Sequence, residues 1–455
     1  MSNVLGLSDQ IYFLGERAMG ATALMQGVWV YNRTIDIDGL QRFHHHLQRG
    51  RLSRRIERSP LPFGRHRWVS PSGKPGLEIV ATPRPREEFD AWLNVQAAAA
   101  LDAEHGPEWR LAVLPFNEGG AGVSLVVSHC LTDGVGLCEA FADAATGRHN
   151  PINWPAAGSR PRWRALREDA RQTARDIPGI GRALVTAARL GLRTRGRAVS
   201  ATPPVSKPPI RPAGADEPFT LPAATIFVDA DEWDARAHSL GGTSNTLLAG
   251  LAARLAQKIG RVTADGSVTL TMPVNERTAG DIRANAVVNV NITVDPAAAR
   301  TDLREIRAAT KQALIRRPDV PDEQSTLLPL VPLVPQWLVR RMVRVVSGSD
   351  TRVDSSNLGV VNPAAYRPDG TDADQFAIRS LARGVTTTIM RRAGGLLTLF
   401  SGRVHRQVFV SVLAYQPGRP NSNDDLRRDL SSALRDFSLT ATTGWGCPEP
   451  VGGAL

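Results

Sequence analysis

The chain has 455 residues, of which 42% are hydrophobic and 22% are charged. This composition is that of a globular protein and excludes disordered, collagen-like and disulfide-rich classes. No apolar run approaches the roughly 20 residues of a membrane span. The first 20 residues lack a basic start followed by an apolar block, so we expect no signal peptide. The cysteines are odd in number and have no metal-ligand spacing, which favours a reducing, cytoplasmic location; they are Cys130, Cys138 and Cys447.

The net charge is one-sided. There are 55 Lys and Arg residues against 44 Asp and Glu, which gives +11. A basic surface favours phosphates, anionic lipid headgroups or an acidic partner. Only 5% of residues are aromatic, and the chain carries no RRM, KH, zinc-finger or basic-zipper signature. We therefore expect no nucleic-acid partner.

The chain divides at a change of composition. Residues 158–215 are rich in Arg, Pro and small side chains and end in a Pro-rich run over 202–212. Such a run cannot continue a helix or a central strand. We therefore expect one lobe over residues 1–157, an Arg/Pro-rich connection over 158–215, and a second lobe over 216–455.

Both lobes mix strands with helices. Alternating or continuous apolar runs predict strands, and apolar residues at helical spacing predict helices. The expected strands are 123–128, 267–272, 286–294, 396–404 and 407–415, and the expected helices are 135–146, 244–259, 301–316 and 424–437. Helices interleave with strands, so the predicted class is α/β or mixed α+β.

The segment 126–136 (VVSHCLTDGVG) is the strongest candidate for chemistry. An apolar strand runs into His129, and a turn with Asp133 and Gly134 precedes a helix. Histidine titrates near neutrality and is suited to general-base work. Asp133 is close enough to hold the turn. We expect Gly134 to allow the backbone angle φ to change sign there. The plainer interpretation is a buried histidine followed by a helix-capping aspartate.

Other signatures of chemistry are missing. The chain has no P-loop, GxGxxG, GxSxG or HExxH motif. His44, His45 and His46 are consecutive, and on a helix they point in three directions, so they do not form one metal site. We expect neither a metal nor a resident cofactor.

His129–Gly134 resembles the HxxxDG motif of the CoA-dependent acyltransferases. This superfamily includes chloramphenicol acetyltransferase, condensation domains, polyketide-associated acyltransferases and bacterial wax ester synthase/diacylglycerol acyltransferases, and the last group is the most similar. Further segments resemble that group in the same order along the chain: 7–14 (LSDQIYFL), 51–68, 243–248 (TSNTLL), 272–277 (MPVNER), 284–289 (ANAVVN) and 355–359 (SSNLG). The chain departs from the pattern at Ser128, where many members carry a first His, at Thr246, and in lacking Pro after Leu358.

The resemblance implies two chloramphenicol-acetyltransferase-like lobes, each with a mixed sheet flanked by helices, and an active-site tunnel between them. It also implies that His129 takes a proton from an acceptor hydroxyl or amine, which attacks an acyl thioester. Asp133 would be structural and pair with an arginine of the second lobe, for which Arg277 is the candidate. Asn245 is an oxyanion or substrate candidate, or a simple helix cap. Ser128 and Thr132 would line the tunnel or only pack.

Two basic stripes run through the connection. Arg164, Arg167, Arg171 and Arg175 follow helical spacing, and Arg182, Arg189 and Arg193 form a second face opposite apolar residues; residues 337–346 repeat the pattern. A basic face beside an apolar face suits a helix on an anionic bilayer. A solvated face on a core-packed helix fits the pattern equally well.

The resemblance implies an enzyme that moves a long acyl chain from acyl-CoA to a lipid hydroxyl, with diacylglycerol or a fatty alcohol as acceptor. We would expect such an enzyme to act in triacylglycerol or wax ester synthesis, at the inner face of the membrane. One alternative is a free-standing condensation or polyketide-associated acyltransferase with a carrier-protein-bound or cell-envelope substrate. Another is a non-catalytic lipid-binding relative.

Overall fold

The computed structural model describes residues 3–71, 73, 75–148, 152–198, 216–278, 280–316, 326–334 and 351–446, with the backbone alone for 190–198. The Pro-rich run, Cys447 and the basic segment 337–346 lie outside the described residues. The described helices are α1 (Leu7–Met19), α2 (Ile37–Leu47), α3 (Phe89–Ala98), α4 (Gly134–Thr146), α5 (Arg162–Ala198), α6 (Ala230–Ser239), α7 (Ser244–Lys258), α8 (Arg304–Arg316), α11 (Thr387–Arg392) and α12 (Asn423–Asp436). Short 3-10 turns are η1 (Arg86–Glu88), η2 (Ala298–Arg300), η3 (Leu328–Leu333) and η4 (Pro363–Tyr366).

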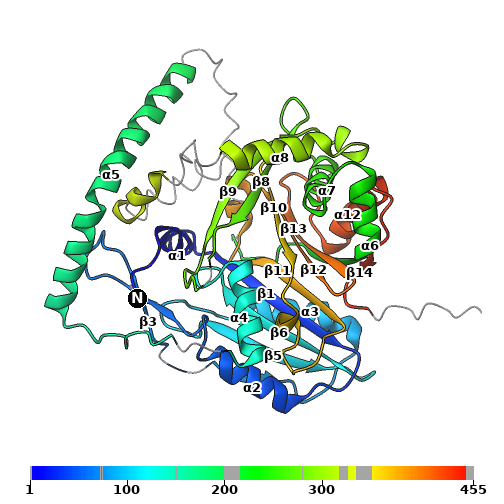
Figure 1. Ribbon diagram of the computed structural model, residues 1–455, viewed down its shortest axis with the longest axis horizontal. Helices are drawn as coiled ribbons and strands as arrows, with labels where there is room; N and C mark the ends of the chain where they lie inside the picture. The colour runs from blue at the N-terminus through cyan, green and yellow to red at the C-terminus, as the bar shows by residue number, and fades with distance from the viewer. Residues whose placement is uncertain are drawn as a thin grey trace, which may run out of the picture.

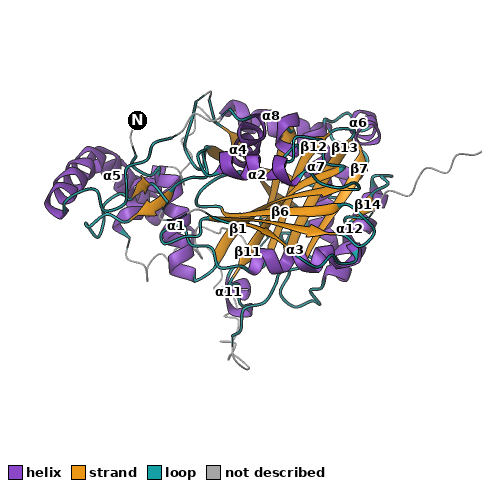
Figure 2. Ribbon diagram, turned by 90° about the horizontal axis from the view of Figure 1, so that it is seen from below, coloured by secondary structure: helices purple, strands orange, loops and turns teal. Residues whose placement is uncertain are grey.

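The first sheet has five strands in the order β11-β1-β6-β5-β4. Its strands are β1 (Thr22–Tyr31), β4 (Leu77–Ile79), β5 (Trp109–Pro115), β6 (Ala121–Ser128) and β11 (Gln375–Arg383). β6 is buried along its whole length, as its continuous apolar run predicts, because helices cover both faces of this sheet. α2 and α4 contact each other on one side of the sheet, and α3 packs on β5, β6 and β11 (Figure 2). A two-stranded ribbon of β2 (Arg55–Glu57) and β3 (Arg67–Val69) lies apart.

The second sheet has seven strands in the order β14-β7-β13-β12-β10-β8-β9. They are β7 (Ala223–Asp229), β8 (Val268–Asn275), β9 (Val287–Val294), β10 (Val353–Val360), β12 (Leu396–Val404), β13 (Gln407–Tyr415) and β14 (Thr442–Thr443). β10 runs parallel to both β8 and β12, and the other pairs are antiparallel. The sheet is therefore mixed, as expected. α6, α7 and α12 cluster over it (Figure 1).

Two large cores hold the molecule together. One core lies between the second sheet and its helices and includes Leu248, Leu251, Leu399 and Leu430. The other fills the first lobe and also takes in Phe400 and Phe409 from the second sheet. Because alternate side chains of β12 and β13 point to opposite faces, the second sheet packs on helices with one face and on the first lobe with the other.

The division along the sequence is not a division in space. β11 comes from the second half of the chain and pairs with β1 of the first half, with Gly27 opposite Ile378. The first sheet is thus completed by a strand that follows the second lobe's own β10. β11 also contacts β12 and β13, so it ties the two sheets together.

The connection between the lobes begins with a long helix. α5 spans 37 residues and contains Pro178. It stands at the side of the molecule (Figure 1) and contacts η3, which in turn contacts α1. Within the described residues, no helix combines the length and the apolar character needed to cross a bilayer.

Candidate functional site

The candidate site is built on the loop between β6 and α4. β6 ends at Ser128, and the His129 amide still donates to the Ala23 carbonyl at 2.9 Å, which holds the loop against β1. Asp133 is the N-cap of α4, and its side chain accepts a hydrogen bond from the Gly136 amide at 2.7 Å. A strand and a capped helix therefore fix both ends of the loop that carries His129.

The His129 ring is held by an aromatic neighbour. Tyr12 of α1 stacks on it, with ring centroids 4.7 Å apart and planes 12° apart. Burial lowers the pKa of His129, against the opposing effects of its own main-chain carbonyl and the Asp133 carboxylate. The Nδ1 atom has no hydrogen-bond partner among the described residues. A neutral imidazole can accept a proton at a ring nitrogen.

Asp133 is the centre of a buried ion pair between the two lobes. Arg277 Nη2 donates to Asp133 Oδ2 at 2.8 Å, and the two side chains are 2% and 4% exposed. The Ala286 amide donates to the same oxygen at 2.8 Å. Arg277 also donates to the carbonyls of Arg283 and Ala284. The structure thus brings together the residues expected to pair, and the end of β8 reaches the start of α4.

Three residues that the sequence analysis left out of the site hold the rest of the loop. The Asn285 side-chain amide donates to the His129 carbonyl at 3.1 Å and to Asp9 Oδ1 at 3.2 Å. Arg54 Nη2 donates to the Leu131 carbonyl at 2.7 Å. Burial lowers the pKa of Arg54 to about 10 and raises the pKa of Asp9. All three residues lie in segments that resemble the family, which are 284–289 for Asn285, 7–14 for Asp9 and 51–68 for Arg54.

Ser128 and Thr132 flank the loop and bond inward. Ser128 Oγ donates to Glu16 Oε1 at 3.3 Å and accepts from the Cys130 amide at 3.2 Å. Thr132 Oγ1 donates to the Asp133 carbonyl at 2.9 Å. Burial raises the pKa of Glu16 to about 7. Ser128 is therefore bonded to a carboxyl group whose pKa burial raises to about 7.

The role expected for Gly134 is wrong. Gly134 is not one of the described glycines with a positive φ. It is the first residue of α4 and does not belong to a turn. The close approach of β12 explains the glycine instead. A Cβ atom at this position would lie 2.3 Å from Phe400 Cζ, so a side chain would collide with the second sheet.

Asn245 does not cap its helix. Thr243 is the N-cap of α7 and forms a capping box with Thr246. Asn245 is the second residue of α7 and is half-buried, and its side chain makes no hydrogen bond to a described residue. The structure therefore leaves its amide free for a ligand, while its place in the reaction stays a prediction. The tunnel also stays a prediction.

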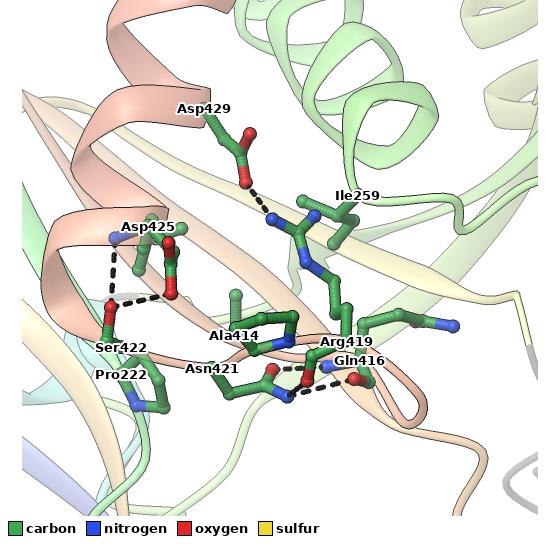
Figure 3. Close-up of a pocket in the computed structure, with 11 residues that line it drawn as sticks. Pro222, Ile259, Ala414, Gln416, Arg419, Asn421, Ser422, Asp425 and Asp429 are labelled. Atoms are coloured by element: carbon green, nitrogen blue, oxygen red, sulfur yellow. Dashed lines mark hydrogen bonds and ion pairs between the residues drawn. The ribbon is translucent and has the colours of Figure 1, made fainter.

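A pocket elsewhere in the second lobe is too small for an acyl chain. It lies between the end of β13, the loop before α12 and the end of α7 (Figure 3). The space open to the centre of a water molecule is about 20 Å³, which is room for little more than one water. Arg419 and Asp429 form an ion pair of 2.6 Å within it. We interpret this pocket as structural.

The histidines of α2 serve the fold. His44 Nε2 lies 2.7 Å from the Pro75 carbonyl, and His46 Nδ1 lies 2.8 Å from the Ala144 carbonyl. One group with metal-ligand proximity is present among the described residues, Asp102, Glu104 and His105. Its carboxylates are engaged by Arg17 and Arg58. Only His105 of the three is exposed, and arginines already pair with both carboxylates, so we interpret the group as structural.

No protein-family model matches the chain, and no curated protein matches it by sequence. Solved structures match it over nearly its whole length. The first condensation domain of the calcium-dependent antibiotic synthetase has a TM-score of 0.55 at 14% identity and covers 96% of each chain. Polyketide synthase associated protein 5 from Mycobacterium tuberculosis has a TM-score of 0.53 at 14% identity, over 95% of this chain and 97% of that one.

The wax ester synthase/diacylglycerol acyltransferase from Marinobacter aquaeolei VT8 has a TM-score of 0.51 at 14% identity, over 96% of this chain and 100% of that one. These similarities establish the arrangement of sheets and helices. The chain therefore has the two-lobed fold shared by condensation domains, polyketide synthase associated protein 5 and wax ester synthase/diacylglycerol acyltransferase.

Proposed function

We propose that this protein is an acyltransferase that moves a long-chain acyl group from acyl-CoA to a lipid hydroxyl, with diacylglycerol or a fatty alcohol as acceptor. The observation that carries the proposal is the state of His129. Its ring is stacked on Tyr12, its pKa is lowered by burial, and its loop is bonded to residues of both lobes. A general base needs a neutral ring in a fixed orientation.

The chemistry follows from that base. The acceptor hydroxyl gives its proton to a nitrogen of His129 as its oxygen attacks the thioester carbon. The oxyanion collapses, the carbon–sulfur bond breaks, and the CoA sulfur takes the proton from the imidazolium. No redox partner or metal enters this balance. The oxyanion needs a hydrogen-bond donor, and the free amide of Asn245 remains our candidate.

Asp133 and Arg277 act on this reaction through position. Their carboxylate and guanidinium groups are bonded to each other and to backbone groups on both sides of the lobe junction. They hold the start of α4 and hence the loop of His129. We propose that neither group exchanges a proton with the substrate.

The substrate class separates three versions of the function. Purified protein is incubated with palmitoyl-CoA and either dioleoylglycerol, hexadecanol or no acceptor, and released CoA is followed with a thiol reagent. Acceptor-dependent release, with the ester identified by mass spectrometry, is the expected result. The His129→Ala variant run in parallel shows whether release depends on the proposed base.

Two other results would replace the proposal. Transfer from a palmitoyl carrier protein, without CoA release from palmitoyl-CoA, would assign the protein to carrier-linked chemistry like that of condensation domains. Binding of palmitoyl-CoA with no transfer from either donor would identify a non-catalytic lipid-binding relative. No resident cofactor is part of any of these versions.

A further inference from the structure

The outward face of α5 carries an apolar stripe. Its members recur every three or four residues and are all exposed: Trp163, Leu166, Ala170, Ala174, Ile177, Gly181, Leu184 and Ala188. At about 100° per residue they fall within a sector about 60° to 100° wide. Trp163, Ile177 and Leu184 are 66%, 59% and 55% exposed. Large apolar side chains that gather on one exposed face mark an interaction site.

Arginines flank this stripe on one side. Arg167, Arg171, Arg175 and Arg182 are exposed and form no ion pair with a described residue. By helical spacing they lie beside the apolar sector, between it and the sector that faces the protein. The exposed surface of α5 therefore combines an apolar band with a band of positive charge.

The acidic residues of α5 turn toward the protein. Asp169 is buried and pairs with Arg67 and Arg160 at 2.9 Å each. Asp176 lies 3.7 Å from Arg65. Glu168 pairs with Arg164 at 2.9 Å. Because these negative charges are matched by arginines, they do not offset the four exposed arginines on the outer side.

The inward sector of α5 is already occupied. Ala165 and Ala183 are buried together with Asp169, and η3 contacts the helix. The second sequence interpretation, a solvated helix whose apolar face packs on the core, requires the apolar stripe to point inward. In the structure the stripe points away from the body, where α5 stands at the edge of the molecule (Figure 1).

We propose that α5 is a docking surface for an anionic lipid bilayer. The helix lies in the membrane plane, with the apolar stripe in the boundary between headgroups and acyl chains and the arginines among the lipid phosphates. A bilayer is the occupant that both bands fit, because it offers negative charge beside a flat apolar layer. The 37 residues of α5 give a helix about 55 Å long, which suits an extended flat surface. This inference does not depend on the proposed acyl transfer.

The test uses the 455-residue chain and sedimentation with vesicles, without any acyl substrate. Vesicles of phosphatidylglycerol and phosphatidylcholine are compared with phosphatidylcholine alone. The charge variant carries Arg167→Gln, Arg171→Gln, Arg175→Gln and Arg182→Gln. A matched control removes the same net charge from exposed arginines on other elements: Arg42→Gln, Arg304→Gln, Arg406→Gln and Arg428→Gln.

We expect the charge variant to partition to anionic vesicles at least about tenfold more weakly than the parent at low salt, and the control to stay within about threefold. The stripe variant, Trp163→Ser with Ile177→Ser and Leu184→Ser, should lose binding at high salt, where the apolar contribution remains. Equal weakening by the charge variant and the control would overturn the proposal, since binding would then follow total charge.

A second measurement reports insertion directly. Lipids brominated along the acyl chain quench tryptophans that enter the membrane. The Trp163→Phe variant should still bind vesicles, but its tryptophan fluorescence should be quenched less than that of the parent. Unchanged quenching would overturn the proposal. Size-exclusion chromatography tests the remaining alternative, in which the stripe joins two copies of the chain. A dimeric parent and a monomeric stripe variant that bind vesicles equally well would overturn the proposal.

Discussion

At the scale of single residues, His129 is the side chain on which the proposed function depends. We predict that His129→Ala folds but loses acyl transfer by about 10²–10⁴-fold, the usual contribution of a general base. The ring contributes a stack on Tyr12, so the loss in stability should be small. The measurement is initial rate together with thermal unfolding. His238→Ala, at an exposed histidine of α6, is the control. Activity within a few-fold of the parent would contradict the mechanism.

Glu16 gives the protein a pH dependence with a definite sign. Burial raises its pKa from 4.5 to about 7, so between these values the folded state keeps a proton that the unfolded state has lost. The contribution of Glu16 to stability therefore falls as pH rises through that window, by at most about 1.4 kcal/mol per pH unit. It is fully present below pH 4.5.

We predict that Glu16→Gln removes this contribution, because an amide stays neutral and can still bond to Ser128. The melting temperature of the variant minus that of the parent should rise between pH 5 and pH 8. Glu305→Gln, at an exposed glutamate of α8, should give a flat difference. A flat difference for Glu16→Gln would show that its carboxyl group titrates normally.

At the scale of elements, the start of α4 is set by contact with β12. Gly134→Ala would place a Cβ atom 2.3 Å from Phe400 Cζ, and Phe400 is buried in the core. We predict a loss of about 1–3 kcal/mol in the free energy of unfolding, the usual cost of overpacking. Gly15→Ala in α1, where the added atom meets nothing within 4 Å, should be neutral or stabilising.

A double variant identifies the cause. Phe400→Leu creates space on β12, so Gly134→Ala should cost less in that background than in the parent. The coupling should be at least about 0.5 kcal/mol, as for residues in direct contact. Urea unfolding of the four proteins measures it. Additive costs would mean that Gly134 is needed for another reason.

At the scale of the whole molecule, the Asp133–Arg277 pair joins the two lobes. We predict that Asp133→Asn lowers the free energy of unfolding by about 3–5 kcal/mol, because it removes the hydrogen-bonded counter-ion of the buried Arg277 guanidinium and leaves only the Glu139 carboxylate, 3.9 Å away. This loss should exceed that of His129→Ala. Asp302→Asn, which breaks an exposed pair with Arg304, should cost no more than about 1 kcal/mol. An Asp133→Asn protein as stable as the parent would contradict this role.

Local patterns of side chains were enough to predict many of the helices and strands. Apolar patterning predicted β12 over 396–404 and β13 over 407–415 with the bounds that the structure has, and α7 and α12 to within one residue. These elements follow from side chains within about ten residues of one another, and their period is visible in the chain. The family resemblance, rather than any local pattern, led to Arg277 as the partner of Asp133.

The contacts between distant segments became visible in the folded molecule alone. The pairing of β11 with β1, the stacking of Tyr12 on His129 and the approach of Phe400 to Gly134 join residues far apart in sequence. The periodicity of apolar residues indicates that a side chain is buried, but it does not indicate which other side chain packs against it. For the same reason, the sequence placed an apolar stripe beside arginines on α5 but did not show which way the stripe faces. Ala165 and Asp169 are buried against the rest of the protein, and this packing turns the stripe outward.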